Sequence, residues 1–431
     1  MFLRIRVFSA AFLCVLMTVH THAQTAGRSS LSDLVQSAFV RNREFLAARQ
    51  HLTEAQGLLR QAGVRPNPTL EVEGGTGRPL GTVGEEEYSA GYFQPIELGG
   101  KRSKRVAVAE AAVKLAEAEL AERTRQLTFE VKNKAIEAIA DGEKSKALAR
   151  LADVNQQAYK LTEARVKEGD AARLDAQLLL VEQSRTEAQQ ATITGRYEAN
   201  LIELRRVIGL TETDAMSPGD TLQADNREPS LATLQELALK QRPDLRTGHL
   251  LEEQGGAEVT LAQAQSRPDV TLSARYVHRN AQFDDQYGFT GSGTRTLLRD
   301  QDNVVLFGAS IPIFTGKRNQ GNIEAASARA TGSTLRRQHL AATIPLDVQA
   351  ASRRWKATKA TLAIFDRGVL GQSEQNLQII RQAYQLGQLR LLDVLNEQRR
   401  LTDIELSYID AKADFLRALI ELERAIAGDL P

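Results

Sequence analysis

The chain has 431 residues, a formal net charge of +1 at pH 7 and 25% charged residues. This near-neutral balance lacks the concentrated positive charge of a nucleic-acid-binding protein, so nucleic acid is not an expected partner. The sequence contains no apolar stretch long enough for a transmembrane helix, so strands would have to carry any membrane-spanning part.

Residues 1–23 have the organisation of a secretory signal peptide. Arg4 and Arg6 precede an apolar run that is too short to span a bilayer, and we expect cleavage after Ala23. The only cysteine, Cys14, follows Leu13 rather than a small residue, which argues against a lipid anchor. The mature chain would therefore contain no cysteine, which excludes disulfides and thiol chemistry.

The remaining sequence contains one series of motifs twice, which indicates an internal duplication. The matching landmarks are Arg65-Pro66 and Arg267-Pro268, Pro95-Ile96 and Pro312-Ile313, Gly169 and Gly387, and Asp175 and Asp393. Between the copies lies a polar segment with two prolines and one glycine (Pro218, Gly219 and Pro229), which is typical of a linker. We predict a first repeat at 24–210, a linker at 211–229 and a second repeat at 230–428.

Each repeat is predicted to begin with a helix and a β-hairpin. Residues 31–62 and 231–264 are rich in Ala, Leu, Gln and Glu, which favours a helix of about 30 residues in each. Apolar and polar residues then alternate, as strands require, near residues 69–73 and 270–276. After a loop rich in glycine and charge, second strands are predicted at 88–96 and 304–313, which makes four strands per chain.

A very long helix is predicted after each pair of strands. In the first repeat it runs from Lys101 to about Lys167, a length of about 100 Å. In the second repeat it covers about 319–385, interrupted only at Pro345, where a kink is expected.

The chain is then predicted to reverse at Gly169 and Gly387 and to return as helices that end near Gly209 and Gly428. Apolar residues at seven-residue spacing and abundant alanine along these segments predict antiparallel coiled-coil hairpins.

Four strands cannot close a barrel, and their unpaired edges would be costly in a membrane. Three copies would supply twelve strands, enough to enclose a lumen. The strand aromatics Tyr88, Tyr92, Tyr276, Phe307 and Phe314 suit membrane interfaces, although a soluble hairpin could carry them equally well. The long helices favour the membrane interpretation, because a soluble sheet has no need of such rods.

Three motifs resemble those of the TolC-type outer membrane efflux factors. They run from Gln94 to Arg102, from Ile311 to Arg318 and from Ala383 to Leu395. The Pro-Ile-Glu-Leu-Gly-Gly-Lys-Arg form of the first motif is most similar to the branch that serves heavy-metal cation efflux pumps of the resistance–nodulation–division type.

The resemblance implies an α+β membrane protein whose four strands contribute to a trimeric, twelve-stranded outer-membrane β-barrel. The helical hairpins would form a periplasmic tunnel. The implied partners are two further copies of the chain, outer membrane lipid, a periplasmic membrane-fusion adaptor and an inner-membrane pump.

The hairpin tips are the first candidate site. On their own, the tip glycines predict helix C-caps, where positive φ is required. The resemblance implies that the tips also dock the adaptor, through Glu168, Gly169, Asp170, Leu386, Gly387 and Gln388.

The periplasmic entrance is the second candidate site. The resemblance implies that Asp393 belongs to an acidic ring and that Tyr384 and Asp175 tie neighbouring hairpins together. Asn396 replaces a second acid that some members carry, which weakens the expected ring. Without the resemblance, both aspartates are equally well explained as solvated acids at helix N-termini. Because Val166 occupies the place of Tyr384 in the first repeat, we expect the second hairpin to be the moving part.

Neither a metal site, a cofactor nor an enzyme activity is predicted. The histidines of the mature chain are scattered, and Gly99-Gly100-Lys101-Arg102 lacks the upstream glycine and the Ser/Thr of a phosphate-binding loop. The sequence favours a channel that passively conducts substrates for an efflux pump, with heavy-metal cations as the leading class. Multidrug efflux and type I protein secretion stay open, as does a different class, a structural coiled-coil stalk or adhesin.

Overall fold

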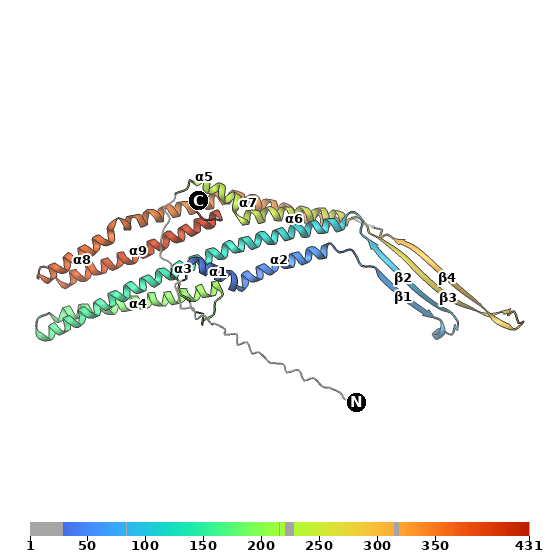
Figure 1. Cartoon of the computed structure of the whole chain (residues 1–431), viewed down its shortest axis with the longest axis horizontal. Coiled ribbons are helices and arrows are strands. Elements are labelled where there is room, and N and C mark those ends of the chain that lie inside the picture. Colours follow the sequence, from blue (N-terminus) through green and yellow to red (C-terminus); the bar gives the residue numbers. More distant parts are fainter. Residues whose placement is uncertain (1–28, 83, 215, 220–227, 314–318, 431) are drawn as a thin grey trace, which may run out of the picture.

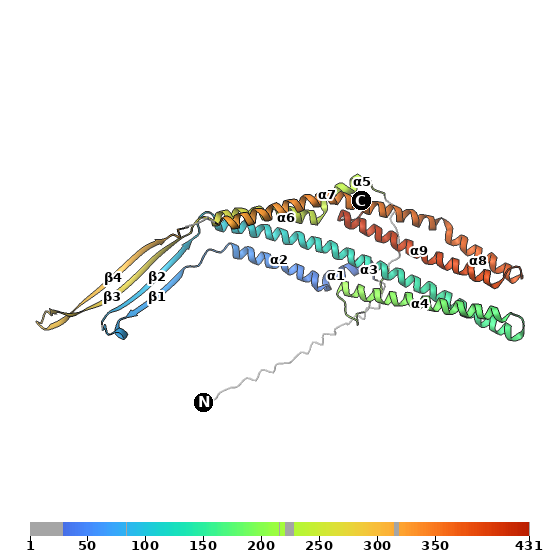
Figure 2. The ribbon, with the colours of Figure 1, turned by 180° about the vertical axis from the view of Figure 1, so that it is seen from behind.

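A computed structural model describes residues 29–430 except 83, 215, 220–227 and 314–318. The predicted signal peptide, much of the linker and Phe314 with Lys317-Arg318 therefore lie outside the described residues. The molecule is elongated, with a sheet at one end and two helical hairpin tips at the other (Figures 1 and 2).

The same order of elements occurs twice. The first repeat contains α1 (Leu31–Arg41), α2 (Arg43–Ala62), β1 (Thr69–Thr76), β2 (Glu86–Ile96), α3 (Lys101–Glu168) and α4 (Arg173–Ile208). The second contains α5 (Leu231–Gln241), α6 (Pro243–Gln265), β3 (Val270–Phe289), β4 (Arg295–Ser310), α7 (Gln320–Ile364), a π-helical segment (Phe365–Val369), α8 (Leu370–Gln385) and α9 (Leu391–Ile426). No helix among the described residues is long and apolar enough to cross a membrane.

The single helix predicted at the start of each repeat is wrong, because each is broken in two. Asn42 leaves the helical conformation and caps α2, accepting a hydrogen bond from the Phe45 amide at 2.8 Å. In the second repeat the break falls at Arg242, since the following Pro243 disfavours the helical conformation there. The Arg242 guanidinium is buried and pairs with Asp244 at 2.6 Å.

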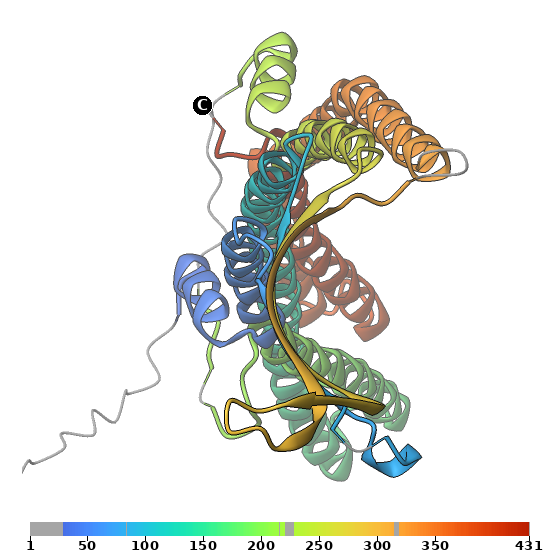
Figure 3. The same cartoon turned by 90° about the vertical axis from the view of Figure 1, so that its right-hand side faces the viewer.

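The four strands form one antiparallel sheet in the order β1-β2-β3-β4, curved across its width (Figure 3). The prediction that the last strand covers 304–313 is wrong at both ends. β4 begins at Arg295, because the polar residues before the predicted start at 304 also pair with β3. It ends at Ser310, shortly before Pro312, which has no N–H to donate to a neighbouring strand.

The 68-residue helix α3 confirms the long rod predicted in the first repeat, about 100 Å at about 1.5 Å per residue. The equivalent rod of the second repeat is interrupted elsewhere than predicted. Helix α7 continues through Pro345, whereas the rod is kinked within the segment Phe365–Val369. Gly368 has φ 107° there, so the break follows from a glycine and not from the proline.

Two apolar cores hold the short helices against the long ones. In the first repeat Leu34 and Ala38 of α1 pack with Leu127 of α3 and Leu204 of α4. The equivalent Leu234 and Ala238 join a larger core, which includes Trp355, Phe415 and Leu422. The cores lie between the sheet and the hairpin tips, so they orient both ends of the molecule.

Candidate functional site

Both hairpin tips have the same backbone structure. The Gly169 and Gly387 residues have φ of 86° and 74°, as a helix C-cap requires. After α3 the amide of Asp170 donates to the Arg165 carbonyl at 2.8 Å, and after α8 the amide of Gln388 donates to the Ala383 carbonyl at 2.9 Å. The six predicted docking residues are all exposed at these tips.

The chemistry of the two tips differs. The first tip presents Glu168 and Asp170, which are charged. The second presents Gln388 and Leu386, whose side chain is 73% exposed. Neither tip is covered by another part of the described chain, and both point away from the sheet (Figure 1).

The two aspartates of the predicted entrance lie in the first turns of α4 and α9. The Asp393 carboxylate accepts a hydrogen bond from the Arg390 amide at 3.0 Å, so this exposed acid caps α9. Asp175 lies at the matching place in α4 and is half-buried. The structure therefore shows Asp393 as an acid at a helix N-terminus, the explanation that its sequence position alone provides.

Tyr384 packs at the contact between the two hairpins. It lies against a small apolar cluster of Leu179 from α4 with Leu391 and Leu395 from α9. This cluster is the part of the hairpin contact nearest to the tips.

A polar layer lies next to this cluster, farther from the tips, and was not predicted from the sequence. Asn155 of α3 accepts a hydrogen bond from the Gln398 amide of α9 at 2.8 Å and donates to the Thr186 hydroxyl of α4 at 3.0 Å. Glu182 of α4 accepts from Arg399 of α9 at 2.7 Å. The first hairpin is thus joined to the second by buried polar groups, because all of these residues except Arg399 are less than one-tenth exposed.

The electrostatics of this layer favour the paired state. The hydrogen bond that Arg399 donates to Glu182 raises the pKa of Arg399 above its usual value, although burial acts in the opposite direction. Since Glu182 is buried, its carboxylate depends on this partner for compensation.

The π-helical segment lies beside α9 in the same half of the second hairpin. Asp366 accepts a hydrogen bond from the Tyr408 hydroxyl at 2.8 Å, and the Phe365 and Tyr408 rings are 5.9 Å apart. These contacts connect the irregular turn to the continuous helix α9.

The sheet at the other end has two chemically different faces. Cross-strand pairing places Tyr88, Tyr92, Tyr276 and Phe307 on one face, together with Leu70, Val72, Leu272 and Val305. Four of the five predicted aromatic residues therefore share one apolar face, and each is exposed, whereas Phe314 lies outside the described residues.

The opposite face is charged. Arg275 pairs with Glu73 at 2.9 Å and with Glu71 at 3.3 Å, and Arg279 pairs with Glu87 at 2.8 Å. An apolar face opposite a charged one is the pattern of a sheet with lipid on one side and water on the other.

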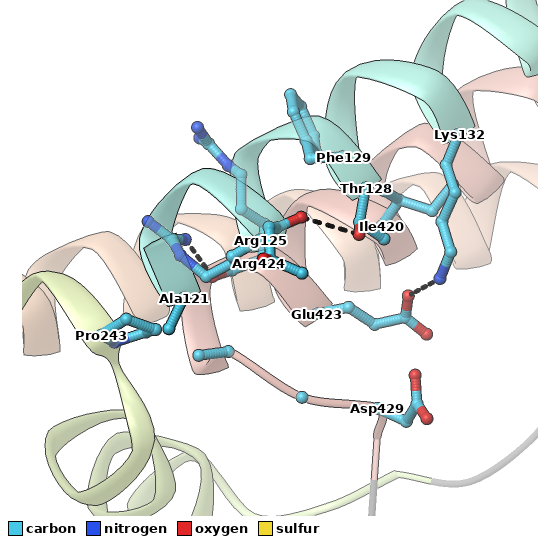
Figure 4. A pocket seen from close by; sticks show the side chains of 13 residues that line it. Ala121, Arg125, Thr128, Phe129, Lys132, Pro243, Ile420, Glu423, Arg424 and Asp429 are labelled. Carbon is cyan, nitrogen blue, oxygen red and sulfur yellow. Dashed lines mark hydrogen bonds and ion pairs between the residues drawn. The ribbon is translucent and has the colours of Figure 1, made fainter. Parts of the chain in front are cut away.

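A cavity of about 260 Å³ lies where α3, α6 and the end of α9 meet (Figure 4). Two of its cationic side chains already have partners, since Lys132 pairs with Glu423 at 3.1 Å and Arg125 donates to the Arg424 carbonyl at 2.6 Å. Arg424 also lies 4.4 Å from the centre of the Phe129 ring. No group of three or more metal-ligating side chains occurs within the described residues.

Comparison with known proteins agrees with this geometry. The chain matches the outer membrane efflux protein family over residues 34–210 and 234–428. The chain belongs to this family. Its members are channels, not enzymes, and they extend from the bacterial outer membrane into the periplasm.

The chain of this outer membrane efflux protein is 24% identical over 405 residues to the cobalt-zinc-cadmium resistance protein CzcC of Cupriavidus metallidurans, covering 94% of this chain and 91% of that protein. Its fold is similar to the Campylobacter jejuni CmeC outer membrane channel, with a TM-score of 0.72, 15% identity and coverage of 92% and 85%. It is also similar to CusC, with a TM-score of 0.71, 18% identity and coverage of 93% and 92%.

Proposed function

We propose that three copies of this efflux protein form one continuous channel, with a twelve-stranded barrel in the outer membrane and a helical tunnel below it. The observation that carries this proposal is the pair of free edges. Within the described chain, β1 and β4 each have a neighbour on one side only. Pairing β1 of one copy with β4 of the next would satisfy both edges and close the barrel.

The dimensions of the apolar face support this arrangement. From Tyr88 to Ile96, β2 contributes nine residues to the sheet, and a tilted transmembrane strand needs about 9–11. In the closed barrel the apolar face would contact lipid, and the charged face around Arg275 would line the lumen.

The hairpin tips are proposed to dock a periplasmic membrane-fusion adaptor, which links the channel to an inner-membrane pump of the resistance–nodulation–division type. Both tips are exposed at the end opposite the sheet, where such a partner could reach them. Asp393 is proposed to contribute to an acidic ring at the entrance, with Tyr384 and Asp175 near the contact between hairpins.

Heavy-metal cations are the proposed substrates, because the similarity to a cobalt-zinc-cadmium resistance protein extends over nearly the whole chain. The test is twofold. The purified protein should form conducting trimers in planar bilayers, and absence of a pore would refute the channel. Deleting the gene should lower resistance to zinc, cobalt and cadmium. Unchanged metal resistance with increased sensitivity to organic drugs would instead favour multidrug efflux.

A further inference from the structure

The hairpin of β3 and β4 extends beyond the other two strands at the end far from the helices (Figure 1). β2 begins at Glu86, which pairs with Asn280 of β3. β3 continues beyond this pair to Phe289, and β4 begins at Arg295. We call residues 281–300 the outer extension. It has no counterpart in the shorter hairpin of β1 and β2.

The pairing register shows which side chains of the outer extension share the apolar face. The irregularity between Gln282 and Tyr287 adds residues to β3, whereas β4 alternates as one strand. Arg295, Leu297 and Arg299 therefore lie on the same side of β4 as Val305 and Phe307. Their partners Tyr287 and Phe289 share that side, since Tyr287 pairs with Leu297 and Phe289 with Arg295.

On β4 of the outer extension, charge is segregated between the two faces. Its apolar-face side carries Arg295 and Arg299 on β4, whereas Asp300 and the neighbouring Asp302 lie on the opposite side. The Arg295 guanidinium lies 3.9 Å from the centre of the Tyr287 ring. Both arginines are exposed, and neither forms an ion pair with another described residue.

The side chains on this face change in order along β3 and β4. The apolar residues around Phe307 and Tyr276 come first, then a belt of uncharged polar groups, and then the two arginines with their aromatic neighbours. The polar belt consists of His278, Asn280, Gln282, Gln301 and Asn303. Arg299 lies about 26 Å along the strand from Phe307, at about 3.3 Å per residue.

We propose that this face of the outer extension binds a phosphorylated glycolipid of the outer leaflet. The inference rests on the proposed function, in which the lower part of the same face contacts acyl chains. Arginine is suited to phosphate because its planar fork donates two parallel hydrogen bonds, and aromatic residues favour the membrane interface. The amides of the polar belt can donate to and accept from sugar hydroxyls.

The test measures lipid binding to the full-length protein in detergent by native mass spectrometry. Rough lipopolysaccharide, the same lipid after dephosphorylation, and phosphatidylglycerol are the probes. Wild-type protein should prefer the phosphorylated glycolipid to both other probes. The double variant R295Q/R299Q should bind it at least about tenfold more weakly, a change of about 1.4 kcal/mol. The control R336Q/R353Q removes the same charge from exposed helical positions and should stay within about twofold of wild type.

Equal binding by wild type and R295Q/R299Q would overturn the inference, as would equal affinity for phosphatidylglycerol. Conductance in bilayers free of lipopolysaccharide separates this result from the proposed function. R295Q/R299Q should conduct like wild type, which shows that the variant is folded. If the wild-type protein formed no pore, the proposed channel would be refuted. The lipid-binding comparison would still decide whether the outer extension binds the glycolipid.

Discussion

The two helical hairpins come from the same repeated motif but differ in continuity. In the first, α3 is helical throughout, and Arg150 pairs with Glu405 of α9 at 2.7 Å. In the second, Gly368 stands at the same distance before the tip glycine as Arg150 does, and the helix is irregular there. The two repeats thus contain one uninterrupted rod and one rod with a joint at Phe365–Val369, where Gly368 has a positive φ.

The contact between the hairpins is the second part of this comparison. Near the tips the contact consists of a small apolar cluster. Farther from the tips it consists of the polar layer of Asn155, Glu182, Gln398 and Arg399. Buried polar groups are satisfied only when their partners lie opposite them, so this layer favours one alignment of the helices. We therefore expect substitutions in the layer to affect both hairpins, and substitutions at the joint to affect only the second.

The largest effect is expected for Arg399→Ala. It leaves the Glu182 carboxylate buried without its main partner and should lower the free energy of unfolding by about 2–4 kcal/mol. Thermal denaturation in detergent measures the change. The control Arg206→Ala removes an exposed pair with Glu203 on α4 and should change the thermal denaturation far less. Equal effects would show that the layer does not hold the hairpins together.

The next effect compares matching ends of the two return helices. Gly209 and Ala427 occupy the same place after α4 and α9, and both have positive φ. A Cβ at Gly209 would lie 2.7 Å from the Arg41 carbonyl oxygen, so Gly209→Ala should destabilise the protein by about 2 kcal/mol or more. Ala427→Gly should instead stabilise it by about 0.5 kcal/mol by relieving strain. Changes of the same sign in the two variants would contradict this account.

At the joint, Gly368→Ala should cost about 1 kcal/mol, because no space limits the side chain but its φ is unfavourable for alanine. Gly371→Ala, three residues later in regular helix α8, should stabilise the protein by about 0.5–1 kcal/mol. Hydrogen exchange should locate the change from Gly368→Ala in α7 and α8. A change that spreads into α3 would argue against an independent joint.

The smallest stability effect is expected at the entrance acids. Asp393→Asn retains a side-chain oxygen for the cap and should cost about 0.5 kcal/mol or less. It should nevertheless lower the cation preference of the pore at low salt, because it removes three like charges from the proposed ring. Asp175→Asn is the matched variant in the first repeat. Unchanged ion selectivity in Asp393→Asn would remove that residue from the entrance.

Much of this architecture could be predicted because its signals are local. The alternation after Arg267-Pro268 indicates a strand, and the tip glycines indicate helix ends with positive φ. The breaks at Asn42 and Arg242 were also local, signalled by a capping side chain and by a following proline, but uniform helical composition concealed them. The joint was misplaced for the opposite reason, since Pro345 is the stronger breaker and yet α7 accommodates it.

The sequence by itself determined the duplication, the strands, the long helices and the chemistry of the tips, because these depend on residues near one another in the chain. Only the tertiary structure decided that Asn155 meets Gln398, since these residues are 243 positions apart and meet through the mutual alignment of three helices. It also decided that four aromatic residues and two arginines share one face of the sheet. That outcome depends on strand register, which is set across the sheet and not along the chain.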